Sequence, residues 1–391
     1  MQPRTKTPGI ITGGKDGLVK LWKIEAGKLV LEKQYDIKDM TIKSMHPQVK
    51  SVQEHPKNGF VLVGTRGGEI LEFSENPKMA KNPRLLLKSH FNNELWGLTP
   101  HPNKQEFLTV GRDGVLGMWD VKDKRQMRYA KLDCGADAVA YNFNGTILAI
   151  GMRNGYLLAV DNNFNPIAKI QNCKKGNEIT CIKFSPHDKI CAVGDKEGKI
   201  KLYDLSKKNA LFKKSKVVKK SSSAITHMDF SSDGSWLMVN NASYEVLYFN
   251  TKFSEIEAEY FKPVGKHEPT SSKCKNVDWQ SQTCTIGWSV QGIFPALSDG
   301  TDVNACARSP EGAILATGDD FGKVNLYRYP CPQRSQHVSA IGHSSHVTNV
   351  CFVESAKKDK NEIRVVSTGG ADLCVFQWKY EYDYDAEQQA R

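Results

Sequence analysis

The sequence predicts an all-β protein, a β-propeller of about eight four-stranded blades, on three observations. A phrase of about ten residues recurs eight times: a glycine-rich turn, then alternating apolar residues that usually end on an aromatic. The repeats lie mostly 41 to 51 residues apart, with one interval of 78, close to the roughly 40–45 residues of a four-stranded blade. Helical periodicity is almost absent. The phrases end at Trp22, Phe73, Trp119, Val160, Tyr203, Phe249, Tyr327 and Trp378.

Each repeat is interpreted as one antiparallel sheet. The turn glycines supply the positive φ that a tight hairpin turn needs, and the residues after them alternate with the period of two of a strand. The sixth repeat, which ends at Phe249, has no turn glycine. The turn glycines are Gly17, Gly114, Gly155, Gly198 and Gly322, and strands are predicted before the turns at 59–64, 106–111, 146–151, 189–194, 235–240 and 313–318, with a further strand at 179–184.

The first blade is predicted to be incomplete, because only its last two strands fit before Trp22. The expected organisation is a partial blade over 1–22, the remaining blades of one propeller over 23–378, and an acidic, tyrosine-rich tail over 379–391. A propeller avoids a bare sheet edge by joining its two ends. Either residues 379–384 complete the ring or this chain is the end of a longer one, and the second alternative is favoured. The tail itself is either a frayed end or a strand that adds to a sheet edge.

Composition excludes several classes of protein. The chain has 391 residues, of which 39 % are hydrophobic, and a net charge of +11, so wholesale disorder is excluded. Its longest apolar stretches are too short for a membrane-spanning helix, and the N-terminus has no signal-peptide pattern. No membrane partner is therefore expected. Ten cysteines without a C-x-x-C pair indicate reduced thiols rather than a zinc site.

The repeats resemble WD repeats. The pairs Trp119-Asp120 and Tyr203-Asp204 lie where the name-giving dipeptide belongs, and Gly342-His343 fits the family's Gly-His. The resemblance implies a buried network of His, Ser/Thr, Asp and Trp, complete in the last repeat and less well spaced in the third. Where Glu197 and Phe321 replace the turn Asp, apolar packing is expected to hold the blade. The implied network residues are His343, Thr368, Asp372 and Trp378, and His90, Thr109, Asp113 and Trp119.

A closer resemblance rests on sequence segments that a generic WD repeat does not require. They are the irregular segment 276–295 and the stretches 298–305, 318–324, 329–331 and 342–350. Together they are similar to the C-terminal propeller of the echinoderm microtubule-associated protein-like family, from about Thr12 to Trp378. The resemblance implies a non-catalytic platform without cofactors that binds tubulin, the microtubule wall and other microtubule-associated proteins, in the cytoplasm or the ciliary axoneme. The family's coiled-coil and basic segment has no counterpart here, so lattice binding through it is not implied.

A lysine-rich segment, residues 207–220, holds seven lysines and no acidic residue. It is interpreted as a loop to the outer strand of a blade, either solvated without a partner or gripping an acidic polymer such as the tubulin tails. Nucleic acid is disfavoured, because the segment has no Arg for base-edge readout. The candidate tubulin contacts are Lys207, Lys208, Lys213, Lys214, Lys216, Lys219 and Lys220.

No catalytic or metal-binding set is predicted. Four carboxylates cluster in the irregular region, but carboxylates in turns of this kind usually accept hydrogen bonds from backbone amides. His346 lies close to His343, which belongs to the implied repeat network. The alternative function is that of a generic WD-repeat scaffold in a soluble multiprotein complex. The carboxylates are Asp299, Asp302, Asp319 and Asp320.

Overall fold

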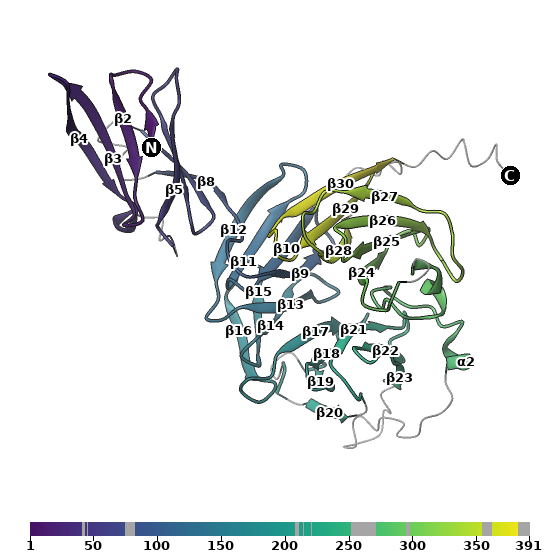
Figure 1. Ribbon diagram of the computed structural model, residues 1–391. Coiled ribbons are helices and arrows are strands. Elements are labelled where there is room, and N and C mark those ends of the chain that lie inside the picture. Colours follow the sequence, from purple (N-terminus) through teal and green to yellow (C-terminus); the bar gives the residue numbers. More distant parts are fainter. Residues whose placement is uncertain are drawn as a thin grey trace. The chain divides into compact units, whose positions relative to one another are not determined.

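The computed structural model describes residues 1–40, 44, 46–74, 83–207, 211–213, 215–219, 221–251, 271–294, 298–353 and 362–381. They form eight antiparallel sheets, six with four strands and two with three, which confirms the predicted all-β class and the number of blades (Figure 1). The chain divides into two compact units, Met1–Asn92 and Asn93–Arg391. No helix in the described ranges is long and apolar enough to cross a membrane.

The first unit contains two four-stranded sheets that share an apolar core, in which Ile11 and Leu21 pack with Val49 and Val63. The first blade was predicted to be incomplete, but its sheet has four strands. Its first strand is only two residues long, too short to show any alternation in the sequence. The strands are β1 (Gln2–Pro3), β2 (Gly9–Gly13), β3 (Leu18–Glu25), β4 (Lys28–Asp36), β5 (Val49–Glu54), β6 (Val61–Thr65), β7 (Glu69–Phe73) and β8 (Arg84–Lys88), with the 3-10 turn η1 (Ile37–Asp39) after β4.

The second unit places six sheets around an axis (Figure 1). The first strand of each sheet is innermost, and β9, β13 and β17 each contact the next inner strand along the chain. The strands are β9 (Leu95–Pro100), β10 (Glu106–Gly111), β11 (Val115–Asp120), β12 (Arg125–Lys131), β13 (Ala136–Tyr141), β14 (Ile147–Met152), β15 (Tyr156–Asp161), β16 (Pro166–Gln171), β17 (Ile179–Phe184), β18 (Ile190–Asp195), β19 (Lys199–Asp204), β20 (Ser215–Lys219), β21 (Ile225–Phe230), β22 (Trp236–Asn241), β23 (Val246–Asn250), β24 (Val303–Arg308), β25 (Ile314–Asp319), β26 (Lys323–Arg328), β27 (Val338–Ile341), β28 (Val347–Val353), β29 (Glu362–Gly369) and β30 (Val375–Glu381).

The second unit closes its ring between its last sheet and its first. β28 packs against β9, the Leu95 amide donates to the Gly370 carbonyl (3.1 Å), and Gln377 Nε2 donates to the Val121 carbonyl (3.1 Å). The stretch 379–384 was one candidate for completing the predicted ring. Its described part pairs with β29, with Lys379 opposite Arg364, so it belongs to the last sheet; residues 382–391 lie outside the described residues.

An irregular segment separates β23 from β24. It contains the short helix α2 (Ser271–Cys274) and the 3-10 helix η3 (Trp288–Ile293). An isolated antiparallel bridge, Ser231 to Trp279, is one of its links to the neighbouring sheet. The buried Trp279 and Cys284 pack with Met238 of β22. Packing therefore holds this segment in the ring where a regular sheet would otherwise lie.

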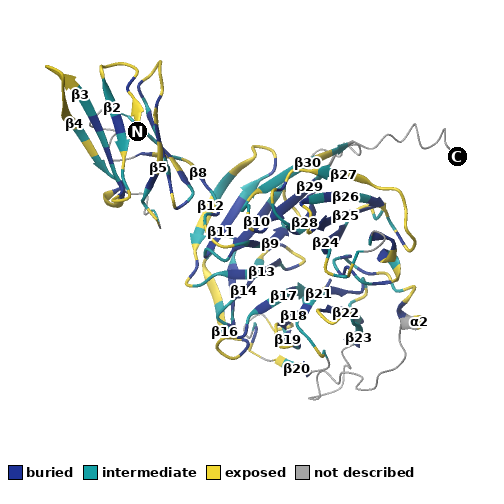
Figure 2. Ribbon diagram, viewed as in Figure 1, coloured by how far each residue is buried: buried dark blue, intermediate teal, exposed yellow. Residues whose placement is uncertain are grey.

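The predicted strands and turns agree closely with the structure. The strand predicted at 179–184 is β17, and the six predicted second strands match β6, β10, β14, β18, β22 and β25 to within about two residues. All five predicted turn glycines have positive φ, between 74° and 86°. In the repeat without a turn glycine, Tyr244 takes this conformation at φ 61°. Figure 2 shows that second strands such as β10 and β14 are largely buried, while outermost strands such as β12 and β16 are largely exposed. The domain boundaries expected at 22 and 378 stay a prediction.

Candidate docking surfaces

The repeat network of the last sheet is centred on Ser367. Its hydroxyl bonds to His343 Nε2 (2.8 Å) and accepts from Trp378 Nε1 (2.8 Å), while His343 Nδ1 bonds to Asp372 Oδ2 (3.0 Å). Burial lowers the pKa of His343, and the bond from Asp372 opposes that shift only in part. The imidazole is therefore a neutral structural link between turn and strand.

Thr368, which the resemblance assigned to this network, lies elsewhere. Successive strand residues point to opposite faces, so the Thr368 hydroxyl instead lies 3.0 Å from that of Thr348. Thr348 Oγ1 donates to the Leu95 carbonyl at 2.6 Å. This pair of hydroxyls therefore belongs to the seam that closes the ring.

Three residues of the second assigned network lie in the second unit. Trp119 Nε1 donates to Thr109 Oγ1 (2.8 Å), and Asp113 accepts from the Val115 amide (2.9 Å). His90 is buried in the first compact unit, whereas the other three residues lie in the second. The same tryptophan–threonine pair occurs in the first sheet, where Trp22 Nε1 donates to Thr12 Oγ1 (2.9 Å); the spacing of ten residues in both pairs could have revealed it.

The turns that lack the WD-type Asp have a polar substitute rather than apolar packing alone. Asp195 accepts from the Glu197 and Lys199 amides (3.0 and 2.9 Å), and Asp319 accepts from Phe321 and Lys323 in the same way (3.0 and 2.9 Å). Both carboxylates are over nine-tenths buried. The turn-capping role has moved two residues earlier, which the sequence analysis missed.

The carboxylates of the irregular region also bond to turns. Asp299 accepts from the Thr301 amide (2.7 Å), Asp302 from the Asp299 amide (3.1 Å), and Asp320 from Asn304 Nδ2 (2.7 Å). Hydrogen bonds from Thr301 lower the pKa of Asp299. Among the described residues there is no group of three metal-ligating side chains. These contacts position turns, and we assign them no acid–base role.

Part of the lysine-rich segment is a strand rather than a loop. β20 is the outermost strand of its sheet, and it carries Lys216 and Lys219. Lys207 and Lys213 are exposed beside it, and Phe212 anchors the segment by packing its ring edge-on to Tyr203, 5.7 Å away. Lys208, Lys214 and Lys220 lie outside the described residues.

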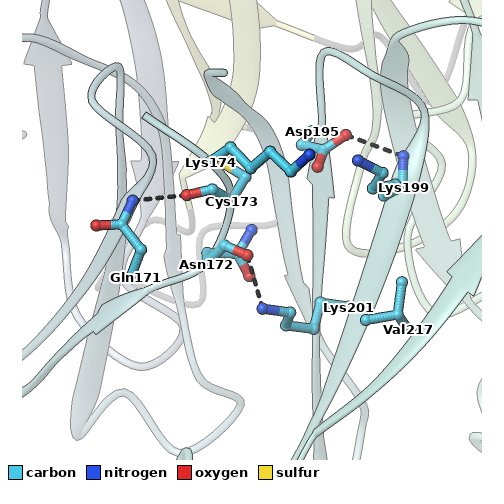
Figure 3. Close-up of a pocket in the computed structure, with 8 residues that line it drawn as sticks. All are labelled: Gln171, Asn172, Cys173, Lys174, Asp195, Lys199, Lys201 and Val217. Carbon is cyan, nitrogen blue, oxygen red and sulfur yellow. Dashed lines mark hydrogen bonds between the residues drawn. The ribbon is translucent and has the colours of Figure 1, made fainter. Parts of the chain in front are cut away.

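The structure adds three lysines that the sequence analysis did not select. Lys174, Lys199 and Lys201 line a pocket of about 360 Å³ that extends from the end of β16 to β20 (Figure 3). Lys201 Nζ donates to the Asn172 carbonyl (2.6 Å), and the turn carboxylate Asp195 accepts from the Lys199 amide at its edge. In register, Lys199 lies opposite Lys219 and Lys201 opposite Val217. We call Lys174, Lys199, Lys201, Lys207, Lys213, Lys216 and Lys219 the basic sector.

A second surface surrounds the mouth of a cavity on the axis of the second unit. The cavity measures about 760 Å³ and is lined by the inner strands and the irregular segment. One face of this ring bears the turns between the second and third strands of each sheet, and we call it the turn face. Paired charges link three of its sheets: Arg112 bonds to Glu94 and Asp137, Arg153 to Asp137 and Glu178, and Lys196 to Glu178.

Burial has opposite outcomes for two of these carboxylates. It raises the pKa of Asp137, against the pull of Arg112. Burial also acts to raise the pKa of Glu178, but the bonds from Arg153 and Lys196 prevail and lower it. The charged side chains in this part of the turn face are thus paired with one another, several of them across neighbouring sheets. We therefore interpret them as contacts that hold the sheets together and not as a ligand site.

Like-built sheets around an axial cavity, joined by WD-type turns, define the second unit as a β-propeller. Residues 95–380 match the family model described as the echinoderm microtubule-associated protein second beta-propeller. The chain belongs to the echinoderm microtubule-associated protein-like family.

Three relatives illustrate the similarity, each 32 % identical over 94 % of this chain. They are the echinoderm microtubule-associated protein-like 2 of Mus musculus, the echinoderm microtubule-associated protein-like 4 of Homo sapiens, and the 77 kDa echinoderm microtubule-associated protein of Strongylocentrotus purpuratus. The matches cover 52 %, 34 % and 49 % of those proteins. The chain therefore spans between a third and about half of the length of these relatives.

Proposed function

We propose that this chain is a non-catalytic docking platform of the microtubule cytoskeleton, which binds tubulin or the microtubule wall through its propeller loops and rim. Its relatives are named as microtubule-associated proteins, and its repeated sheets form a stiff support on which several weak contacts can add up. The place of action would be cytoplasmic or axonemal microtubules, together with other microtubule-associated proteins.

The basic sector is the observation that carries this proposal. Five of its lysines come from two adjacent strands or the segment directly before them, Lys199 and Lys201 on β19 and Lys213, Lys216 and Lys219 at β20. Lys199 pairs with Glu197, and Lys216 lies on the opposite face of the sheet from Lys199 and Lys201. The sector therefore gathers lysines at the outer edge of one sheet, and such a basic edge suits an acidic, extended polymer such as a tubulin tail. Screening over roughly 8 Å at physiological salt makes the contact short-ranged and salt-sensitive.

Co-sedimentation with microtubules tests the proposal. We expect the chain to pellet with microtubules, and we expect pelleting to weaken severalfold when a protease removes the acidic tubulin tails. The variant Lys174→Ala/Lys213→Ala/Lys216→Ala should weaken it to a similar degree. The matched control, Lys104→Ala/Lys122→Ala/Lys131→Ala, removes three exposed lysines from another sheet and should pellet like the unchanged chain.

The outcomes separate the alternatives. Pelleting that survives both tail removal and the basic-sector variant would retain the microtubule platform but reject the electrostatic grip. Absence of pelleting at every salt concentration would favour the generic WD-repeat scaffold. Retention on a nucleic-acid column at physiological salt, lost in the basic-sector variant, would favour nucleic acid instead.

A further inference from the structure

Two exposed aromatic side chains lie on neighbouring turns of the turn face. Tyr244, in the turn between β22 and β23, is 50 % exposed, and Phe321, in the turn between β25 and β26, is 68 % exposed. Large aromatic side chains usually bury their surface. Two of them on adjacent turns of one face therefore call for a functional explanation.

Each aromatic occupies a position where the repeat would favour another residue. Phe321 stands where the WD turn has Asp, and the capping role has moved to the buried Asp319. Tyr244 adopts φ 61°, a conformation that suits glycine and is costly for a bulky side chain. Gly300 leaves room for its ring, because a Cβ there would fall 2.4 Å from Tyr244 Cε1. Departures from local rules of this kind concentrate at functional sites.

Carboxylates lie between the two aromatics. The turn of Asp299 and Asp302 adjoins Gly300, the Asp320 amide donates to the Asp302 carbonyl (3.0 Å), and Asp320 directly precedes Phe321. Asp299 and Asp320 are exposed. None of these three carboxylates has an ion-pair partner among the residues that the structure describes, in contrast to the paired charges elsewhere on the turn face. We call Tyr244, Asp299, Asp302, Asp320 and Phe321 the aromatic–acidic arc.

We infer that the aromatic–acidic arc is a docking site for a basic, extended peptide segment of a partner protein. Charge complementarity identifies the occupant: an Arg or Lys side chain can bond to an exposed carboxylate while its cation lies over an aromatic face. Tyr244, Gly300 and Thr301 also line the mouth of the axial cavity, which gives the adjoining part of the peptide room to continue. This site is opposite in charge to the basic sector, so the platform could hold an acidic and a basic partner at once.

Fluorescence anisotropy with two labelled peptides tests the inference on the full chain. One peptide is a 12-residue Gly/Ser sequence with four Arg, and the other has Glu in place of each Arg. We expect the Arg peptide to bind, and to bind more weakly as salt rises. Phe321→Ser, and separately Asp299→Asn/Asp320→Asn, should each weaken its binding about fivefold or more. Binding of the Glu peptide should not change in either variant.

Matched controls come from the opposite face of the same ring. Phe143→Ser removes an aromatic that is 52 % exposed, and Glu311→Gln removes an exposed carboxylate from the turn at the other end of β25. Both controls should bind the Arg peptide like the unchanged chain. The inference is overturned if the Arg peptide fails to bind, if the controls weaken binding as much as the arc variants, or if the arc variants leave it intact. Self-association of the chain that the arc variants abolish would reject a separate partner in favour of a second copy.

Discussion

One buried carboxylate, Asp229 on β21, holds the irregular segment in the ring. It is fully buried and accepts from Ser281 Oγ (2.5 Å) and from the Thr283 and Cys284 amides (both 2.7 Å). A carboxylate that accepts several hydrogen bonds offsets the cost of its own desolvation. These bonds add to the packing of Trp279 and Cys284 and to the two bonds between the Asn240 side chain and the Ile286 backbone, which also hold the segment.

Replacing Asp229 should destabilise the second unit strongly. Asp229→Ala removes the acceptor of two backbone amides and of the Ser281 and Thr283 hydroxyls, so we expect the free energy of unfolding to fall by about 2–4 kcal/mol. Urea denaturation followed by tryptophan fluorescence measures it. The control Asp133→Ala removes an exposed carboxylate paired with Lys169, and its effect should be small beside that of Asp229→Ala. Equal effects of the two substitutions would contradict the role of Asp229.

Two histidines should make the fold sensitive to acid. Burial lowers the pKa of His227 to about 4 and also lowers the pKa of His343. The unfolded chain protonates both near pH 6.5, so below that pH the unfolded state binds more protons. The contribution of His227 to stability is complete above about pH 6.5 and is lost as the pH falls towards 4, and the contribution of His343 is also lost as the pH falls below 6.5.

Thermal melts between about pH 7.5 and 4.5 test this linkage. We expect the Tm to fall over the lower part of this range, and His227→Gln to flatten the fall because the titrating group is gone. His187→Gln removes an exposed imidazole and should leave the slope unchanged. A slope that is the same in all three proteins would show that His227 does not carry the effect.

At the scale of elements, a recurring glycine lets one sheet dock on the next. It ends, or nearly ends, the second strand of its sheet, and a Cβ added to it would fall 2.2 to 2.7 Å from a branched side chain at the start of the following inner strand. The same contact occurs in both compact units. Close packing of the sheets therefore depends on the absence of one side chain. The pairs are Gly13 with Val49, Gly151 with Ile179, Gly194 with Ile225 and Gly318 with Val347.

Adding one methyl group at this contact should separate two sheets. Gly194→Ala places a Cβ 2.7 Å from Ile225 Cγ2, which must shift within a packed core, and we expect a loss of about 1–3 kcal/mol of unfolding free energy. Chemical denaturation gives the value. Gly287→Ala is the control, because its nearest neighbour lies 3.7 Å away and its backbone is extended. If Gly194→Ala is as stable as Gly287→Ala, the contact is not close-packed in solution.

At the scale of the whole molecule, the ring of the second unit closes on itself. The seam between β28–β30 and β9–β12 combines backbone and side-chain hydrogen bonds with an apolar cluster that includes Phe107, Val121 and Val366. Closure packs the last sheet against the first, so that the inner face of neither sheet is left exposed to water. Stability in this unit is thus shared around the ring rather than added blade by blade.

Residues 93–391 should fold alone. The second unit has its own core and its own closed seam, so we expect a single cooperative thermal transition in calorimetry and retained β-sheet signal in circular dichroism. A shorter chain that ends at residue 346 lacks β28–β30 and should lose cooperativity, because its ring is open. A non-cooperative transition for residues 93–391 would contradict independent folding.

Much of the fold could be predicted, because its signals are local. Apolar stretches bounded by turn residues predict β17 to the residue and β22 closely, since strand alternation and turn preference are properties of adjacent residues. The two-residue β1 carries no such pattern. The sequence analysis assigned Thr368 to the network, whereas the structure has Ser367 there. Which of these two neighbouring hydroxyls faces His343 depends on the orientation of the strand in the sheet.

The candidate surfaces were less predictable. The run of lysines before β20 is visible in the sequence, but Lys174 joins it only because a different sheet ends beside β20. The five residues of the aromatic–acidic arc are likewise up to 77 positions apart in the sequence, between 244 and 321, and only the fold brings them to one face.

By itself the sequence determined the all-β class, the number of sheets and the family, because repeats and turn residues act over a few neighbouring positions. Only the tertiary structure decided that the second unit closes between β28 and β9, that Asp229 holds the irregular segment, and which charges are paired. These depend on contacts between residues far apart in the chain. Their energies come from burial and hydrogen-bond geometry, which no local pattern encodes.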